Sequence, residues 1–256
     1  MRTPEPEIFY VGYLPVPRRL RGFLAVAALI LVAAFFGLGY AVSSTQRDPG
    51  DGAFRWDWGR QTVTGILRAE PYPTVTLTQA SERFAEGQTL MLSGGGKRGV
   101  QDRAAPLDGQ LVSVSGIALT RGDLDMIQVR GAADGLEAIA GDGAGAEVPA
   151  DVALGRWRVT GEICDGKCVA GAMRPGRGLS HKACANLCLI GGVPPVFVAT
   201  GEIEGSAFLL MAGPDGNALG PEILDAVARL VEVEGAVLRR GDLLILRIDP
   251  ETLRLL

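Results

Sequence analysis

The segment Leu111-Val-Ser-Val-Ser-Gly-Ile-Ala-Leu-Thr-Arg-Gly-Asp-Leu124 recurs later in the chain as Leu230-Val-Glu-Val-Glu-Gly-Ala-Val-Leu-Arg-Arg-Gly-Asp-Leu243. Both copies begin with a strict period-two alternation of side chains, which is typical of a β-strand. Arg-Gly-Asp then stands where a hairpin must turn, because glycine adopts turn conformations that are costly for other residues. The repeat therefore predicts the same strand-turn-strand unit twice.

The match extends beyond this segment. Gly94 lies 22 residues before Gly116, and Gly213 lies 22 residues before Gly235. Internal repetition at a fixed spacing indicates duplicated structural units. Short strands with one helix before the last hairpin are the arrangement of a small Greek-key barrel of the OB type. We therefore predict a mostly β protein with two tandem OB-like barrels, in which the clearest helical pattern is 221–229.

The second half differs from the first by one insertion. Gly65 lies 29 residues before Gly94, whereas its counterpart Gly161 lies 52 residues before Gly213, which leaves 23 additional residues in the second half. These residues belong to the interval 164–196, which we name the cassette. Because the first barrel lacks it, the cassette is not needed for the barrel core.

An apolar run at 22–42 follows Arg18, Arg19 and Arg21. It is long enough to cross a membrane as a helix, and it is longer than the apolar region of a signal peptide. Arginines before the run place the N-terminus in the cytoplasm. The predicted order is a cytoplasmic segment 1–21, a transmembrane helix 22–42, a tether 43–60, a first barrel 61–130, a Gly/Ala-rich linker 131–155 and a second barrel 156–256.

Beyond residue 42 the chain carries 21 basic and 27 acidic side chains, a net charge of −6. A protein that binds the nucleic-acid backbone needs a basic stripe, so we expect no nucleic-acid partner. The sequence also lacks a catalytic acid/base pair or nucleophile motif. Gly94-Gly-Gly-Lys97 lacks the phosphate-loop frame and is interpreted as a glycine-rich hairpin turn. We therefore expect a non-catalytic protein.

All the cysteines and the only histidine lie in the cassette: Cys164, Cys168, His181, Cys184 and Cys188. An even number of cysteines in an exported, Gly/Pro-rich loop favours two structural disulfides, and this is the interpretation that we prefer; it requires no cofactor. Pairing between the two Cys-x3-Cys motifs is favoured over pairing within them, because closing a longer loop removes more unfolded-state entropy.

Two other interpretations stay open. Four cysteine thiolates would suit zinc or an iron–sulfur centre, and a mixed set with His181 and Met173 would suit copper, although the spacing matches no firm metal motif. One Cys-x3-Cys pair could instead carry out thiol redox chemistry or copper relay, although the chain lacks the βαβ pattern of thioredoxin-like proteins. A short helix over 180–189 would place Cys184 and Cys188 on one face.

The cassette is also basic. Lys167, Arg174, Arg177 and Lys182 stand against a single acidic residue, Asp165, between Cys164 and Val196. A basic loop on an acidic domain is typical of a docking surface for an acidic protein. The predicted function is a non-catalytic, membrane-tethered binding or assembly subunit, for example of a respiratory or redox complex. The alternative is a periplasmic metalloprotein that binds copper, zinc or an iron–sulfur centre through the cassette.

Two stretches at the start of the cassette and within it resemble a pattern in uncharacterised bacterial exported or membrane-anchored proteins. They are Gly161-Glu-Ile-Cys-Asp-Gly-Lys-Cys168 and His181-Lys-Ala-Cys-Ala-Asn-Leu-Cys-Leu-Ile-Gly-Gly-Val-Pro-Pro195. The resemblance covers about 35 residues and implies no activity. It implies a bacterial source, so the expected location is the inner membrane, crossed once, with the barrels in the periplasm.

Overall fold

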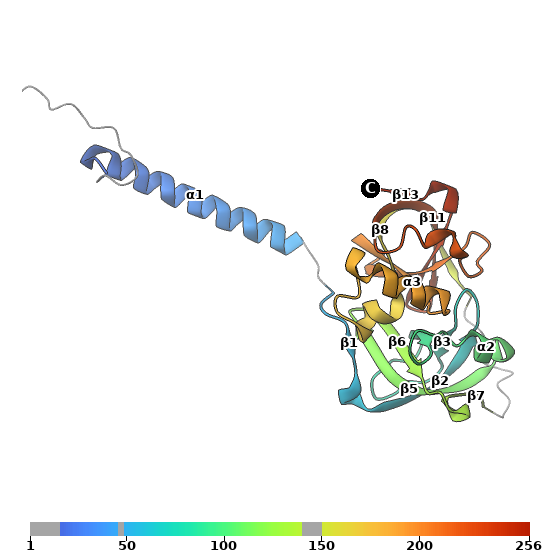
Figure 1. Ribbon diagram of the computed structural model, residues 1–256. Coiled ribbons are helices and arrows are strands. Elements are labelled where there is room, and N and C mark those ends of the chain that lie inside the picture. Colours follow the sequence, from blue (N-terminus) through green and yellow to red (C-terminus); the bar gives the residue numbers. More distant parts are fainter. Residues whose placement is uncertain (1–15, 46–48, 140–149) are drawn as a thin grey trace, which may run out of the picture. The chain divides into compact units, whose positions relative to one another are not determined.

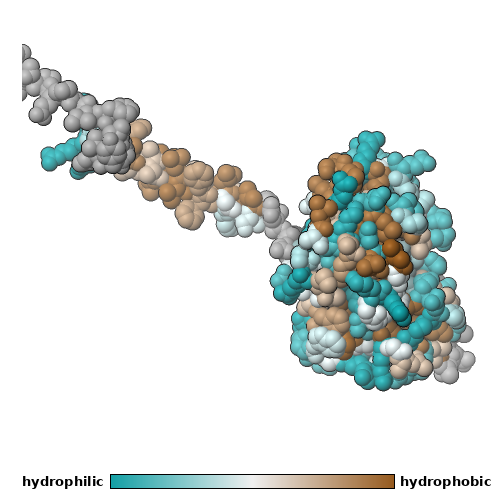
Figure 2. Space-filling view, viewed as in Figure 1, coloured by the Kyte–Doolittle hydropathy of each residue, from teal (hydrophilic) through white to brown (hydrophobic). Residues whose placement is uncertain are grey.

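The computed structural model describes residues 16–45, 49–139 and 150–256 (Figure 1). The chain forms two compact units, Met1–Asp48 and Pro49–Leu256. In the first unit, α1 (Arg18–Thr45) is long and apolar enough to cross a membrane, and Figure 2 shows apolar residues over its middle. The apolar N-terminal helix was thus predicted correctly, whereas most of the predicted segment 1–21 lies outside the described residues.

The first barrel is a closed sheet of five strands. In chain order these are β2 (Arg60–Arg68), β3 (Thr74–Leu77), β4 (Thr89–Ser93), β5 (Leu111–Arg121) and β6 (Leu124–Val129). Antiparallel pairs join β2 to β3 and β5, β3 to β4, and β5 to β6, and the parallel pair β4–β6 closes the barrel. Between β4 and β5 lie α2 (Gln101–Ala104) and η2 (Ala105–Leu107).

The second barrel repeats this topology. Its strands are β8 (Val152–Asp165), β9 (Pro195–Ile203), β10 (Ser206–Ala212), β11 (Leu230–Arg240) and β12 (Leu243–Ile248). The order β12-β10-β9-β8-β11 closes through β11–β12, and β10–β12 is again the parallel pair. A short strand, β13 (Arg254–Leu255), pairs with β11. The prediction of two OB-like barrels is confirmed.

The repeated glycines occupy equivalent positions. Gly122 and Gly241 lie at the tips of β5–β6 and β11–β12, both with φ of +58°, where a residue with Cβ is strained. At Gly116 and Gly235 a Cβ would lie 2.1 and 2.3 Å from a carbonyl oxygen of the paired strand. Turn geometry and close approach of the strands therefore explain why the two halves share these glycines.

Helix 221–229 was predicted incorrectly. Only one 3-10 turn, η7 (Pro221–Ile223), forms there, and the chain continues through turns to Ala228, whose φ is +61°. Ile223 and Val227 are buried in the core of the second barrel, so the apolar spacing reflects core packing rather than a helix. The corresponding segment of the first barrel contains α2 and η2.

The flanking segments are more ordered than a linker and a tether. Within the predicted linker, η3 (Ala133–Gly135) leads to β7 (Leu136–Ala138), which pairs with β5, and β8 begins near its end; 140–149 lie outside the described residues. In the predicted tether, β1 (Ala53–Phe54) pairs with β5, and η1 (Trp56–Trp58) brings Trp58 onto the barrel core. The end of the tether therefore packs against the first barrel.

The two barrels share a third core at their junction. It joins Met91, Leu119 and Met126 of the first barrel to Phe208 and Ile245 of the second. Polar contacts surround it. The buried guanidinium of Arg240 donates to the Glu70 carbonyl and to Thr74 Oγ1, at 2.9 and 3.2 Å, and the Thr89 amide donates to Asp242 Oδ1 at 2.7 Å. The barrels therefore form one compact body.

Asp125 on β6 gives this body a pH-dependent stability. Burial, followed by repulsion from Asp242 and Asp123, raises the pKa of Asp125 to about 7. The folded state therefore binds the proton of the Asp125 carboxyl group more tightly than the unfolded state does. The contribution of this protonated group to stability is complete below about pH 4 and is lost as the pH rises through about 7. We expect the difference in the free energy of unfolding between Asp125→Asn and the wild type to grow by about 1–2 kcal/mol in favour of the variant as the pH rises from about 5 to about 8. This range allows for partial exposure of the carboxylate.

Urea unfolding of the detergent-solubilised chain at both pH values measures this difference. Asp102→Asn is the control, because Asp102 is an exposed carboxylate of the same barrel. An Asp125→Asn variant whose stability falls with pH as steeply as that of the wild type would contradict the assignment.

Candidate metal centre

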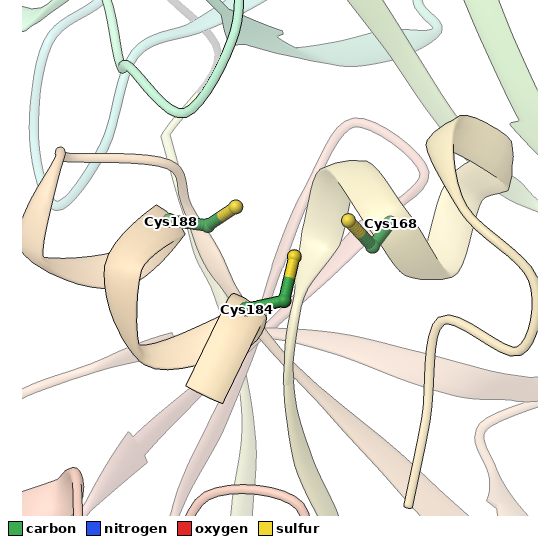
Figure 3. A group of neighbouring side chains, drawn as sticks. All are labelled: Cys168, Cys184 and Cys188. Carbon is green, nitrogen blue, oxygen red and sulfur yellow. The ribbon is translucent and has the colours of Figure 1, made fainter. Parts of the chain in front are cut away.

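Three cysteines converge in the cassette. Cys168 begins the helical turn η5 (Cys168–Ala172), shortly after β8 ends. Cys184 and Cys188 lie one turn apart on α3 (Lys182–Ile190) and so share a face, as predicted. The three Sγ atoms lie within 4.8 Å of one another, and in Figure 3 they point toward a common centre. Cys168 and Cys188 are buried, and Cys184 is half-buried.

A second group shares Cys168. His181 Nε2 lies 3.0 Å from Asp165 Oδ2, and Asp165 Oδ1 accepts the amide hydrogen of Cys168 at 2.8 Å. One ligand atom from each of Asp165, Cys168 and His181 lies within 4.8 Å of the other two, and all three residues are buried. The carboxylate thus fixes both the orientation of the imidazole and the start of the turn that carries Cys168. His181 was predicted as a member of the site from the sequence, whereas Asp165 was not.

Cys164 does not belong to either group. It lies on β8, paired with Val196 of β9, and its side chain belongs to the core between the barrels. Its Sγ lies 3.9 Å from the Glu162 carbonyl, and burial raises the pKa of this thiol well above its usual value. The prediction of a four-cysteine site is therefore wrong: Cys164 is on a strand and Cys168 on a helical turn, so the first Cys-x3-Cys pair does not share a face.

The prediction of two disulfides is also wrong. All four cysteines are free thiols in the structure. Because Cys164 lies apart from the other three cysteines, the two motifs are not placed to form two disulfides with each other. Three thiols remain together, and they come from two segments of the cassette that the Gly/Pro-rich stretch 173–178 connects.

A loop of the first barrel, 94–99, covers this cluster. Lys97 Nζ lies 2.6 Å from Cys184 Sγ and 3.9 Å from Cys188 Sγ. Lys167, which is only 3% exposed, donates to the carbonyls of Gly94 and Gly96 at 2.7 and 2.8 Å. The role of Gly94–Lys97 was not predicted from the sequence, where this segment is interpreted as a glycine-rich hairpin turn. Nothing in the spacing of the first half indicates a contact with the cassette of the second.

Hydrogen bonds and charge set the protonation of the thiols. A hydrogen bond from the Cys168 thiol, together with the Lys97 ammonium, lowers the pKa of Cys188, whereas the same hydrogen bond and burial raise the pKa of Cys168. The hydrogen bond with Cys184 raises the pKa of Lys97, and burial lowers that of Lys167. The arrangement therefore favours negative charge on Cys188 and a retained proton on Cys168.

The Asp165–His181–Cys168 group has the residue types of a cysteine hydrolase triad. In such a triad the cysteine must react as a thiolate, which a lowered pKa favours. Here the pKa of Cys168 is raised, and the side chain is only 6% exposed. The group therefore fits a ligand set better than a nucleophile.

The basic residues of the cassette are mostly engaged within the protein. Burial removes Lys167 from any docking surface, which corrects its assignment as a docking residue. Lys182 donates to the Asp225 carbonyl, and Arg174 donates to the Gly52 carbonyl at 3.2 Å. Arg177 forms an ion pair with Glu162, in which Nε lies 3.4 Å from Oε2. Arg174 keeps 68% of its side chain exposed. Of the four predicted docking residues, Arg174 is thus the most accessible.

Comparison of the chain with protein-family models, with curated proteins and with solved structures finds no match.

The contact between the 94–99 loop and the cassette is sterically tight. A Cβ at Gly191 would lie 1.9 Å from the Lys97 carbonyl oxygen, although the φ of Gly191, −78°, suits any residue. We expect Gly191→Ala to displace the loop and to lower the free energy of unfolding by about 1–3 kcal/mol, the usual scale for overpacking. Equilibrium unfolding in urea measures the loss.

Gly201→Ala is the matched control, because a Cβ at Gly201 meets no atom within 4 Å. Equal stability of the Gly191→Ala variant and the wild type would show that the loop does not rest on the cassette.

Proposed function

We propose that the chain is a membrane-anchored protein that binds Cu(I) through the thiolates of Cys168, Cys184 and Cys188. The observation that carries this proposal is the convergence of three sulfur atoms within 4.8 Å, under a loop of the first barrel. Thiolates are soft ligands, and they select soft metals over calcium, magnesium or manganese. Because ligands must lose their protons, the ion would displace the proton that the thiols share.

Two features favour copper over the other metals considered. Structural zinc sites use four protein ligands, and iron–sulfur clusters generally use four cysteines, whereas Cys164 lies outside this cluster. Cu(I) accepts a trigonal set of sulfur ligands. A fourth sulfur, the thioether of Met173, lies 4.0 Å from Cys184 Sγ, and thioethers also favour Cu(I).

The charges around the cluster also support binding of Cu(I) by three thiolates. Three thiolates and a single monovalent cation leave an excess of negative charge in a partly buried site. The Lys97 ammonium contacts Cys184, and Lys167 interacts electrostatically with Cys188 and Cys168. Two lysines thus offset the excess charge. His181, held by Asp165, lies beside Cys168 and is positioned as a further ligand or as an orienting group.

The N-terminal apolar helix indicates where the protein would bind copper. Arg18, Arg19 and Arg21 precede the apolar part of α1, which supports a cytoplasmic N-terminus and barrels on the outer side of a bacterial inner membrane. In that compartment the protein would bind copper in the periplasm while remaining tethered by one helix. Docking of an acidic partner through exposed Arg174 is compatible with this role.

Metal titration of the reduced, detergent-solubilised chain tests the proposal. We expect one Cu(I) per chain, and we expect Cys168→Ser, Cys184→Ser and Cys188→Ser each to lower the affinity by at least about tenfold, because each removes one thiolate ligand. Competition with a Cu(I) chelator measures the affinity, and titration with Zn(II) measures the selectivity.

Cys164→Ser is the matched control, because Cys164 is a buried cysteine of the same cassette outside the cluster. The proposal is wrong if Cys164→Ser weakens binding as much as the other three, or if the wild type retains zinc in preference to Cu(I).

A reporter fused after Leu256 tests the topology. We expect alkaline phosphatase to be active there, because it folds only outside the cytoplasm, and a cytoplasmic reporter to be inactive. When fused before Arg18, the cytoplasmic reporter should be active and alkaline phosphatase inactive. Activity of the cytoplasmic reporter fused after Leu256 would contradict the proposed orientation.

A further inference from the structure

A cavity of about 400 Å³ opens beside the thiol cluster. Cys168 is the one member of the three-thiol group that lines it, and Met173 lines it as well. Since the thioether of Met173 lies 4.0 Å from Cys184 Sγ, sulfur atoms connect the cavity to the centre of the cluster. Its volume is in the range of small-molecule sites.

The lining of this cavity is positively charged. Three arginines, Arg121, Arg174 and Arg177, stand against one carboxylate, Asp51. Arg121 is held by a hydrogen bond to the Gly50 carbonyl at 2.8 Å and lies over the ring of Phe208. Arg174 lies 3.4 Å from Asp51, whose side chain is 81% exposed, so water screens this ion pair. A second carboxylate, Glu162, lies outside the lining with its Oε2 atom 3.4 Å from Arg177 Nε. Three arginines against these two carboxylates leave one net positive formal charge at the cavity.

This charge is the opposite of what a free cation needs. A positively lined cleft lowers the local concentration of Cu(I) or Zn(II) ions and raises that of anions, with effects on association rates of about 10- to 1000-fold. A cation would have to pass this cleft to reach Cys168 from the cavity. An anionic complex of the metal meets no such barrier, because the arginines attract it.

We infer that the arginine-lined cavity receives the metal as a small anionic thiolate complex of Cu(I), and this inference rests on the proposed function. Transfer is a ligand exchange in which copper stays Cu(I). A bond forms between copper and Cys168 Sγ, a bond between copper and the donor thiolate breaks, and the proton of the Cys168 thiol passes to the departing donor. Exchange onto Cys184 and Cys188 completes the transfer in the same way.

Loading kinetics of the reduced full chain test this inference. The anionic probe is Cu(I)–glutathione, and the cationic probe is Cu(I) as its acetonitrile complex, each followed by the ultraviolet absorbance of copper–thiolate bonds. For Arg121→Gln/Arg174→Gln/Arg177→Gln we expect loading from Cu(I)–glutathione to slow by about tenfold or more, and the rate of the wild type to fall with added salt. Loading from the acetonitrile complex should not slow, and the final stoichiometry should stay the same.

Arg174→Gln alone, at an exposed side chain, gives a smaller slowing without risk to the fold. Arg254→Gln, an exposed arginine of the second barrel, is the control and should load like the wild type. Equal rates from Cu(I)–glutathione in all variants, with copper retained, overturn the inference and leave the proposed function in place. Failure of the wild type to retain copper from either probe overturns the proposed function itself.

Discussion

Apolar packing between the two barrels positions the rest of the molecule. Met91 and Met126 of the first barrel lie in one buried cluster with Phe208 and Ile245 of the second. Each such side chain contributes about 1.5–3 kcal/mol when it is fully buried. The thiols belong to the second barrel, whereas Lys97, which contacts them, belongs to the first. The complete site therefore exists only while this interface is closed.

The cassette uses that interface to stay ordered. It replaces the short connection between the first two strands of a barrel, so it leaves the sheet at β8 and returns at β9 close to the junction. Asp165, Lys167 and the 94–99 loop supply the polar contacts that a Gly/Pro-rich segment cannot make within itself. Without a disulfide, these contacts and the shared core hold three sulfur atoms together.

Sequence reasoning succeeded where the signal is local or repeated. Period-two alternation and matched glycine spacing predicted both barrels, because strand faces and hairpin turns depend on neighbouring residues. The spacing of Cys184 and Cys188 predicted their common face for the same reason. The position of Cys164 was not predicted, because the equal spacing of the two motifs gives no sign of the change from strand to helical turn between Cys164 and Cys168. The roles of Lys97 and Asp165 were not predicted either, because they depend on contacts between segments distant in sequence. The apolar pattern at 221–229 misled because packing in a barrel core can imitate one face of a helix.

The contacts that complete the site join distant parts of the chain. Lys97 and Cys184 are 87 residues apart in sequence, and Lys167 and Gly94 are 73 apart. Contacts of such separation close long loops, and they are lost together when the two barrels part. Any ligand that binds only the assembled cluster stabilises the closed interface in proportion to RT ln(1 + [L]/Kd). Ligand binding at the thiols and association of the two barrels are therefore thermodynamically linked. A substitution deep in the junction would change ligand affinity although it contacts no ligand atom.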